Sequence, residues 1–223
     1  MKLYGRRLSP YVERVYLQIL FKGLEDKIIL TDIPGGDLKS PEYLAISPLG
    51  KMPLLEDGDF RLPESGVITE YIEEKFPEKP TLPEDMVARA RTRLLARFLD
   101  FYVLAPMFQL LPQISADERD EALIAEKLAE IARGLDLVEN MAGDGAHLIG
   151  DTWTIADFAA IPTFFILTRY LPGLGAEPFA GRDRLAAWFE AVGKTDFFKA
   201  SEAAQEEALK AFLARMQAQR DAQ

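Results

Sequence analysis

The sequence predicts an α/β domain with a mixed four-stranded sheet, followed by an all-helical domain that forms a bundle. Short β-branched segments alternate with helical patterns up to about residue 76, and long Ala-, Leu- and Glu-rich helical patterns follow. The three prolines at 77–84 separate the two parts. With 223 residues the chain can bury two cores, so we expect a first domain over 1–78, a linker over 79–85 and a helical domain over 86–223.

The apolar pattern of the first domain changes period several times. Val12, Val15 and Ile19 recur at helical spacing after Pro10, and Gly23 is a typical helix terminator. The predicted elements, in order, are strand 1–5, a helix from Pro10, strand 27–31, a short helix at 41–46, hairpin strands 52–55 and 60–62 around Asp57-Gly58, and a helix from Ser65 that stops before Pro77. Two strands joined through a helix favour parallel pairing, and the hairpin adds antiparallel pairing. This order resembles the thioredoxin-type unit.

Strand patterns end after Asp85. Helical patterns cover 86–111, 117–141 and 155–170, with shorter ones near 182–193 and 201–219. The second domain is therefore predicted to be entirely helical.

Composition excludes several classes of function. The chain has no cysteine and one histidine, which excludes disulfides, thiolate metal sites, a cysteine nucleophile and a histidine-rich metal site. A net charge of −10 disfavours nucleic acid and anionic membrane as partners. No unbroken apolar run reaches the roughly 18 residues that span a bilayer, and the N-terminus lacks the apolar core of a signal peptide. We therefore expect a cytoplasmic protein without a metal.

Polar groups at two predicted helix starts could meet an anion. Ser9 comes just before Pro10, which is the first helical residue. The Ser9 hydroxyl could therefore either cap the helix or donate to a bound anion. Ser65, after Glu64, also begins a helical pattern, where backbone N–H groups can hold a carboxylate. Sequence alone leaves both alternatives open at both positions.

Three segments of the sequence resemble the cytosolic glutathione S-transferases. Residues 9–15 (SPYVERV) are similar to the Ser-Pro-Phe-x-x-Arg-Val segment of plant tau-class enzymes, and 49–58 (LGKMPLLEDG) match the family at many positions. The zeta and omega classes are related, although omega enzymes carry cysteine where this chain has Ser9. Residues 150–157 (GDTWTIAD) match a second family marker, in which Thr154 and Asp157 approximate a capping box with a structural role. The resemblance covers nearly the whole chain.

The resemblance implies a glutathione site and a role for each matching residue. Ser9 would activate the thiol, with Tyr4 as an alternative hydroxyl. A cis Met52-Pro53 bond would let the backbone of Met52 pair with the cysteinyl part of glutathione. Glu64 and Ser65 would hold the γ-glutamyl end, and Lys39 and Lys51 are candidates for the glycine carboxylate.

The resemblance also implies a second, apolar substrate site between the domains. Its candidate residues are Tyr11, Phe101, Tyr102, Leu104, Phe108 and Phe165, although many of these suit a core equally well. His147 follows a glycine-rich stretch and is expected to be an exposed loop residue.

The predicted function is that of a homodimeric glutathione transferase in detoxification, which activates the glutathione thiol for attack on a hydrophobic electrophile. One alternative is a glutathione-dependent isomerase or ether-cleaving lyase on the same fold. Another is a non-catalytic ligand-binding or regulatory protein that keeps the fold.

Overall fold

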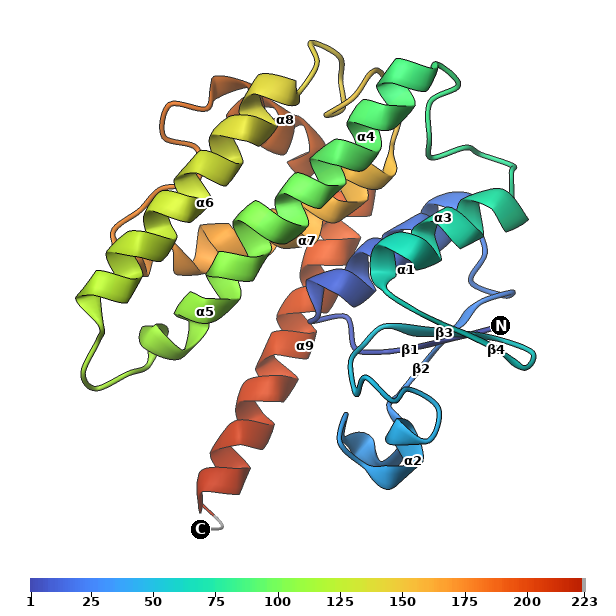
Figure 1. The fold of residues 1–223 in the computed structure, drawn as a ribbon, viewed down its shortest axis with the longest axis horizontal. Coiled ribbons are helices and arrows are strands. Elements are labelled where there is room, and N and C mark those ends of the chain that lie inside the picture. The colour runs from blue at the N-terminus through green and yellow to red at the C-terminus, as the bar shows by residue number, and fades with distance from the viewer. Residues whose placement is uncertain (222–223) are drawn as a thin grey trace. The chain divides into compact units, whose positions relative to one another are not determined.

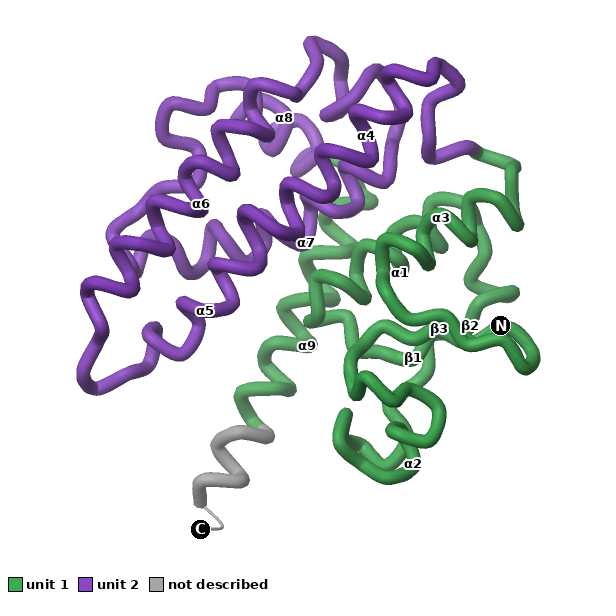
Figure 2. The backbone as a smooth tube through the Cα atoms, in the orientation of Figure 1, with its two compact units in different colours: residues 1–79, 195–223 green, residues 80–194 purple. Residues whose placement is uncertain are grey.

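The computed structural model describes residues 1–221, with side chains through residue 214. This part of the chain divides into two compact units (Figure 2). The first unit comprises Met1–Lys79 together with the segment from Thr195, and the second comprises Pro80–Lys194.

Within the described residues the first unit holds one four-stranded sheet (Figure 1). Its strands are β1 (Lys2–Tyr4), β2 (Ile29–Thr31), β3 (Leu54–Asp57) and β4 (Phe60–Pro63), in the spatial order β2-β1-β3-β4. β1 pairs parallel with β2 and antiparallel with β3, and β3 pairs antiparallel with β4. The predicted mixed sheet is confirmed.

Helices cover the two faces of this sheet unequally. α1 (Pro10–Lys22) and α3 (Ser65–Lys75) enclose the main core, in which Leu3 and Leu55 meet Val15 and Ile68. On the other face, η1 (Pro34–Gly36) and α2 (Pro41–Leu44) accompany a smaller cluster built on Tyr4, Ile33, Tyr43 and Leu54. Alternate residues of β1 thus serve different cores, as the period of two in a strand requires.

The second unit is helical throughout its described elements. They are α4 (Met86–Phe98), the π-helical segment η2 (Leu99–Leu104), α5 (Ala105–Ile114), α6 (Glu121–Met141), α7 (Ile155–Tyr170), η3 (Pro172–Leu174) and α8 (Asp183–Gly193). The sequence pattern at 86–111 predicted one regular helix, whereas the structure has a π-helical stretch in its middle. α6 packs closely against this stretch at Gly134. A Cβ at that position would lie only 2.3 Å from the Tyr102 carbonyl oxygen, so only glycine fits there.

One helix among the described residues, Met86–Ile114, is long and apolar enough to cross a membrane by length and composition alone. Half of its most apolar stretch is buried inside the protein, and core helices of soluble proteins meet the same criterion. The absence of a membrane partner stays a prediction.

The C-terminal helix α9 (Asp196–Asp221) groups with the first unit, not with the helical one (Figure 2). This differs from the predicted domain 86–223, whose last residues 222–223 lie outside the described part of the chain. The physical reason is a buried polar contact, in which the Ser201 hydroxyl donates to the Glu13 carboxylate of α1 at 2.6 Å. Amphipathic periodicity predicts a helix but does not say which polar group it will meet.

Candidate functional site

The strand register brings the predicted ligand-binding segments to one edge of the sheet. Tyr4, the last residue of β1, pairs with Thr31 at the end of β2 and with Leu54 at the start of β3, and Leu54 pairs with Pro63 at the end of β4. The segments that carry Ser9, Lys39, Met52-Pro53 and Glu64-Ser65 therefore all leave the sheet at this edge, which we call the loop edge.

Ser9 occupies the N-cap position of α1, with Pro10 as the first helical residue. Its carbonyl oxygen accepts from the N–H groups of Val12 and Glu13 at 3.0 and 2.9 Å, but in the described chain its hydroxyl makes no capping bond. The backbone thus starts the helix without the side chain. The hydroxyl stays available at a helix N-terminus, where the peptide dipoles favour an anion.

Met52-Pro53 is a cis peptide, as the resemblance implied. The segment before it is held by Tyr43, whose hydroxyl donates to the Lys51 carbonyl oxygen at 2.7 Å. Burial raises the pKa of the Tyr43 phenol, more than its hydrogen bond to Ser47 lowers it, so the phenol stays protonated and keeps donating. Side-chain packing below the loop edge therefore fixes the backbone that an extended ligand would meet.

Glu64 and Ser65 form the start of α3. Glu64 has φ +71° and ψ 104°, a conformation that residues other than glycine rarely adopt and that costs about 1–3 kcal/mol. Its side chain is exposed, whereas Ser65, the first helical residue, is buried. Strained backbone of this kind occurs mostly at ligand sites, which supports a binding role for this turn.

Both candidate lysines lie at the surface, and Lys39 lies close to the residue before Lys51. Both side chains are exposed, and the Lys39 Nζ approaches Gly50, the residue before Lys51, to within 3.0 Å of the position its Cβ would take. Tyr4, the alternative hydroxyl, is buried in the smaller cluster and donates to the Glu56 carboxylate at 3.4 Å. Its hydroxyl therefore has a partner within the sheet, while that of Ser9 makes no bond to its own helix.

The predicted electrophile pocket stays a prediction, and its candidates divide by burial. Leu104 and Phe165 are buried, whereas Phe101 is 60% and Tyr102 is 50% exposed. Phe108 and Tyr11 are partly exposed, and the Arg14 guanidinium lies 5.3 Å from the centre of the Tyr11 ring.

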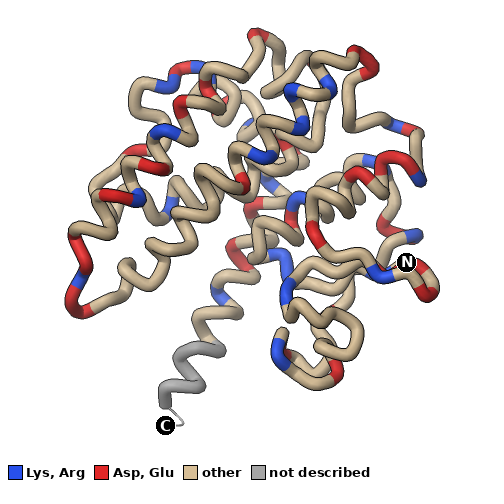
Figure 3. The backbone as a smooth tube through the Cα atoms, viewed as in Figure 1, with Lys and Arg blue, Asp and Glu red and all other residues tan. Residues whose placement is uncertain are grey.

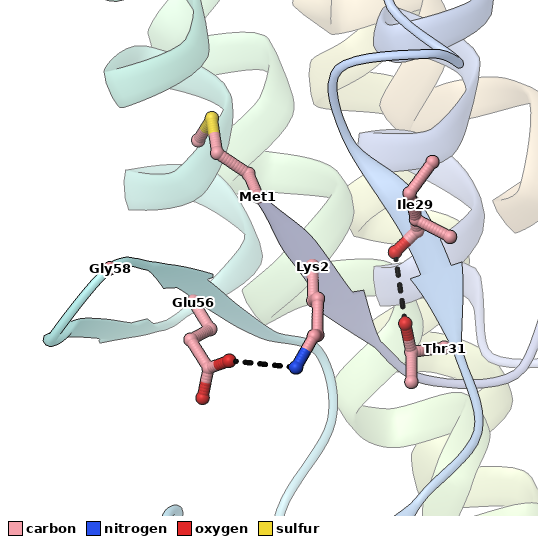
Figure 4. A pocket seen from close by; sticks show the side chains of 6 residues that line it. All are labelled: Met1, Lys2, Ile29, Thr31, Glu56 and Gly58. Atoms are coloured by element: carbon pink, nitrogen blue, oxygen red, sulfur yellow. Dashed lines mark hydrogen bonds and ion pairs between the residues drawn. The ribbon is translucent and has the colours of Figure 1, made fainter.

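A shallow cavity lies over residues of β1, β2 and β3 (Figure 4). Lys2 and Glu56 form an ion pair of 3.3 Å across it, and its other lining residues are Met1, Ile29, Thr31 and Gly58. It contains no residue of the predicted glutathione site. Among the described residues no cluster of His, Asp and Glu side chains could hold a metal ion.

The second sequence marker is a structural centre of the helical unit. The buried carboxylate of Asp157 accepts from the N–H and hydroxyl of Thr154, and both halves of a capping box are present. It also accepts from the Leu148 N–H at 3.0 Å and the Trp188 indole N–H at 2.9 Å, two partners that the sequence did not reveal. One carboxylate therefore joins the start of α7 to the preceding loop and to α8.

The expectation that His147 is an exposed loop residue is wrong. Its side chain is 13% exposed, its ring lies 4.5 Å from that of Trp153, and its Nδ1 lies 3.7 Å from Asp157. Gly145 packs against the Gly150 carbonyl oxygen too closely for a side chain, and Arg184 holds the loop by donating to the carbonyl oxygens of Gly143, Gly145 and His147.

Sequence reasoning also missed the groups around Glu13. Arg7, just before Ser9, makes two hydrogen bonds to the buried Glu13 carboxylate at 2.8 and 2.7 Å. Glu13 lay inside the recognised segment 9–15, but a glutamate in the first turn of a helix usually faces solvent and gives no signal of burial.

Comparison with known proteins identifies the family. The model of the glutathione S-transferase N-terminal domain matches residues 3–80, and that of the C-terminal domain matches residues 121–191. Glutathione S-transferase 3 of Zea mays is 34% identical over 212 residues, which cover 92% of this chain and 94% of that protein. The chain belongs to the glutathione S-transferase family.

Further similarities extend to an isomerase and to a solved structure. Maleylacetoacetate isomerase of Pseudomonas aeruginosa is 32% identical over 186 residues, covering 80% of this chain and 86% of that protein. A glutathione transferase homolog of Drosophila mojavensis, solved with bound glutathione, has a TM-score of 0.74 and 26% identity over 94% of each chain. The predicted family and the predicted thioredoxin-like domain followed by a helical domain are confirmed.

Proposed function

We propose that this glutathione transferase binds glutathione along the loop edge, with Ser9 as the residue that stabilises the thiolate. The observation that carries the proposal is that Ser9 is the N-cap residue of α1 but its hydroxyl makes no capping bond. Ser9 also lies at the loop edge, together with the other residues predicted to contact glutathione. Glutathione is the co-substrate of this enzyme.

The rest of the tripeptide is assigned to backbone and charged groups of the same edge. The backbone of Met52, before the cis bond to Pro53, pairs with the cysteinyl residue as an added strand would. Ser65 at the start of α3 holds the α-carboxylate, and the exposed Glu64 holds the α-ammonium. Lys39 and Lys51 supply positive charge for the glycine carboxylate.

The energy that this mechanism requires is modest. A free thiol has a pKa near 8.5, so only about 3% is ionised at pH 7. Lowering that pKa by about two units takes ~2.7 kcal/mol of differential stabilisation. A hydrogen bond to an anion contributes about 1.5–3 kcal/mol and a helix N-terminus about 0.3–1 kcal/mol, which together suffice. The thiolate then attacks a hydrophobic electrophile, for which Phe101, Tyr102 and Phe108 offer exposed aromatic surface.

The similarity to a maleylacetoacetate isomerase supports a second candidate function. In an isomerase the thiolate would add to an activated double bond and leave again after rotation, so the same glutathione site would serve. Turnover of maleylacetoacetate with catalytic glutathione would favour the isomerase. Stoichiometric consumption of glutathione with aryl halides or activated alkenes would favour the transferase, with a cytoplasmic role in detoxification.

We propose a homodimer from the exposed face of α4. Met86, Val87 and Leu94 are 45–79% exposed, and Arg residues also lie along this helix (Figure 3). Large exposed apolar side chains that recur along one helix mark an interaction surface. Sedimentation at micromolar concentration should give a species of twice 25.0 kDa, and a monomer would contradict this proposal.

Calorimetry with reduced glutathione tests the binding proposal. We expect about one site per chain, with no requirement for added metal. An absence of both heat and thermal stabilisation at millimolar glutathione would overturn the proposed site.

A further inference from the structure

We propose that Ser201, on the C-terminal helix α9, is a positioning residue for thiol activation, which acts through Glu13 and Arg7 on the Ser9 turn. The proposal rests on the assignment of the thiolate to Ser9. It concerns contacts within the first compact unit alone.

The starting observation is a buried charge cluster that encloses the Ser9 turn. Glu13 is 0% exposed, and Arg7 grips its carboxylate with two nitrogen atoms, in the geometry that makes Arg–carboxylate pairs directional. Arg7 stands two residues before Ser9 and Glu13 four residues after it. Their ion pair therefore closes the chain across Ser9 and fixes the turn from both sides.

Backbone hydrogen bonds and a cation–π contact further restrict the conformation of the Ser9 turn. The Ser9 N–H donates to the Arg6 carbonyl oxygen at 3.0 Å, and the Glu13 N–H donates to the Ser9 carbonyl oxygen at 2.9 Å. The guanidinium of Arg7 also lies 4.5 Å from the centre of the Tyr16 ring. The direction of the Ser9 hydroxyl is thus set by a backbone that Arg7 and Glu13 hold in place.

α9 completes the cluster. The Ser201 hydroxyl, 0% exposed, donates to the same Glu13 Oε1 that Arg7 contacts, at 2.6 Å, and the Gln205 amide donates to the Ser201 oxygen at 3.2 Å. A buried carboxylate needs several donors to stay ionised. Burial lowers the pKa of Arg7, but the hydrogen bonds and charge of Glu13 outweigh it and raise that pKa, so Arg7 stays charged.

This arrangement separates positioning from binding. None of Arg7, Glu13 and Ser201 belongs to the set assigned to the glutathione backbone or its carboxylates. Loosening the cluster should therefore change how well the Ser9 hydroxyl meets the thiolate, and change much less how tightly the tripeptide binds.

The test is the pKa of the thiol in bound glutathione, followed by thiolate absorbance in the ultraviolet. Ser201→Ala should raise this pKa by about half a unit to one unit. At a pH below the thiol pKa it should lower kcat about three- to tenfold. The glutathione KM should change less than twofold. Glu13→Gln, which keeps the volume and leaves Arg7 without a charged partner, should move the same quantities further in the same direction.

Thr163→Val is the matched control. Thr163 is buried in α7 of the other unit, and its hydroxyl bonds only the Ala159 carbonyl oxygen of its own helix, at 2.7 Å, among the described contacts. This variant should lose stability without any shift of the thiol pKa. If Ser201→Ala and Glu13→Gln behave like Thr163→Val, the cluster is merely structural and the proposal is wrong.

Ser9→Ala, measured alongside, separates the two proposals. A raised thiol pKa in Ser9→Ala with none in Ser201→Ala or Glu13→Gln overturns the positioning role alone. An unchanged thiol pKa in Ser9→Ala overturns the assignment of Ser9 and the positioning role with it.

Discussion

Two helix starts in this protein use the same type of residue in opposite ways. α7 begins at Thr154, whose hydroxyl and N–H are both bonded to the buried Asp157. α1 begins at Ser9, whose hydroxyl makes no bond to the described helix. A hydroxyl at an N-cap is thus either part of the fold or free for a ligand, and the difference lies in whether a carboxylate three residues later turns back to it.

The N-termini of α7 and α1 also differ in burial. The start of α7 is sealed, since Thr154 and Asp157 are buried and every oxygen of the carboxylate has donors. The start of α1 carries Pro10, which has no N–H to satisfy, and its partly exposed Ser9 faces the loop edge. One helix start stabilises the fold, and the other leaves the Ser9 hydroxyl without a capping bond, so that it can donate to an anion.

The largest change in stability is expected at the buried start of α7. Asp157→Ala should lower the free energy of unfolding by about 3 kcal/mol, because it leaves the Trp188 indole N–H and the Leu148 N–H buried without an acceptor. Chemical denaturation measures this loss. Asp144→Ala, an exposed aspartate in the preceding loop, is the control and should stay within about 0.5 kcal/mol of the parent. Unchanged stability with lost turnover would mean that Asp157 belongs to the chemistry.

The open start should show the reverse pattern. Ser9→Ala should lower turnover about ten- to a hundredfold at neutral pH, which corresponds to a charge-assisted hydrogen bond of ~1.5–3 kcal/mol. Glutathione affinity and the free energy of unfolding should hardly change, since the hydroxyl caps nothing. The thiol pKa should rise toward its free value. If turnover and thiol pKa both survive, Tyr4, Tyr11 or backbone N–H groups hold the thiolate instead.

The start of α3 tests whether a helix N-terminus contributes to glutathione affinity and not to turnover. Ser65→Ala should raise the glutathione Kd about five- to thirtyfold, from the loss of about 1–2 kcal/mol of a hydrogen bond to a carboxylate. The kcat at saturating glutathione should change little, because Ser65 is assigned to the far end of the tripeptide. Calorimetry and steady-state kinetics separate the two constants. An unchanged Kd would remove Ser65 from the site.

The smallest effect is expected when the sealed start loses only its hydroxyl. Thr154→Val should cost about 1 kcal/mol of stability, as for other N-caps, because the backbone N–H still bonds Asp157. Turnover per folded molecule should be unchanged. A larger loss of activity than of stability would link this helix start to the ligand.

Much of the fold follows from local sequence. The predicted helix over 155–170 matches α7, and the helix from Pro10 ends before Gly23 as expected. The hairpin predicted around Asp57-Gly58 is present as β3 and β4, but its two-residue turn is Gly58-Asp59. These elements are set by periodicity and by residues with fixed backbone preferences, which act over a few positions. The order of elements also suffices for a parallel β1–β2 pair and the antiparallel hairpin.

Other features could not be predicted, because they depend on groups far apart in the chain. The buried Nζ of Lys22, at the end of α1, donates to the carbonyl oxygens of Phe76, Glu78 and Lys79 and pairs with Glu73 at 2.8 Å. The grouping of α9 with the first unit, through the bond from Ser201 to Glu13, could not be predicted either. For Lys22 and Ser201 a polar side chain is buried because a partner far away in the sequence satisfies it.

The sequence by itself determined the helix starts at Ser9 and Ser65, and its resemblance to the glutathione S-transferases made Ser9, Met52-Pro53 and Glu64-Ser65 the candidates for binding glutathione. Only the tertiary structure decided that these segments share one sheet edge, that the Ser9 hydroxyl is left uncapped while that of Thr154 is not, and that α9 bonds Glu13. The physical reason is range. Backbone preferences act between neighbours along the chain, whereas strand register and buried hydrogen bonds are chosen among groups that meet only after folding.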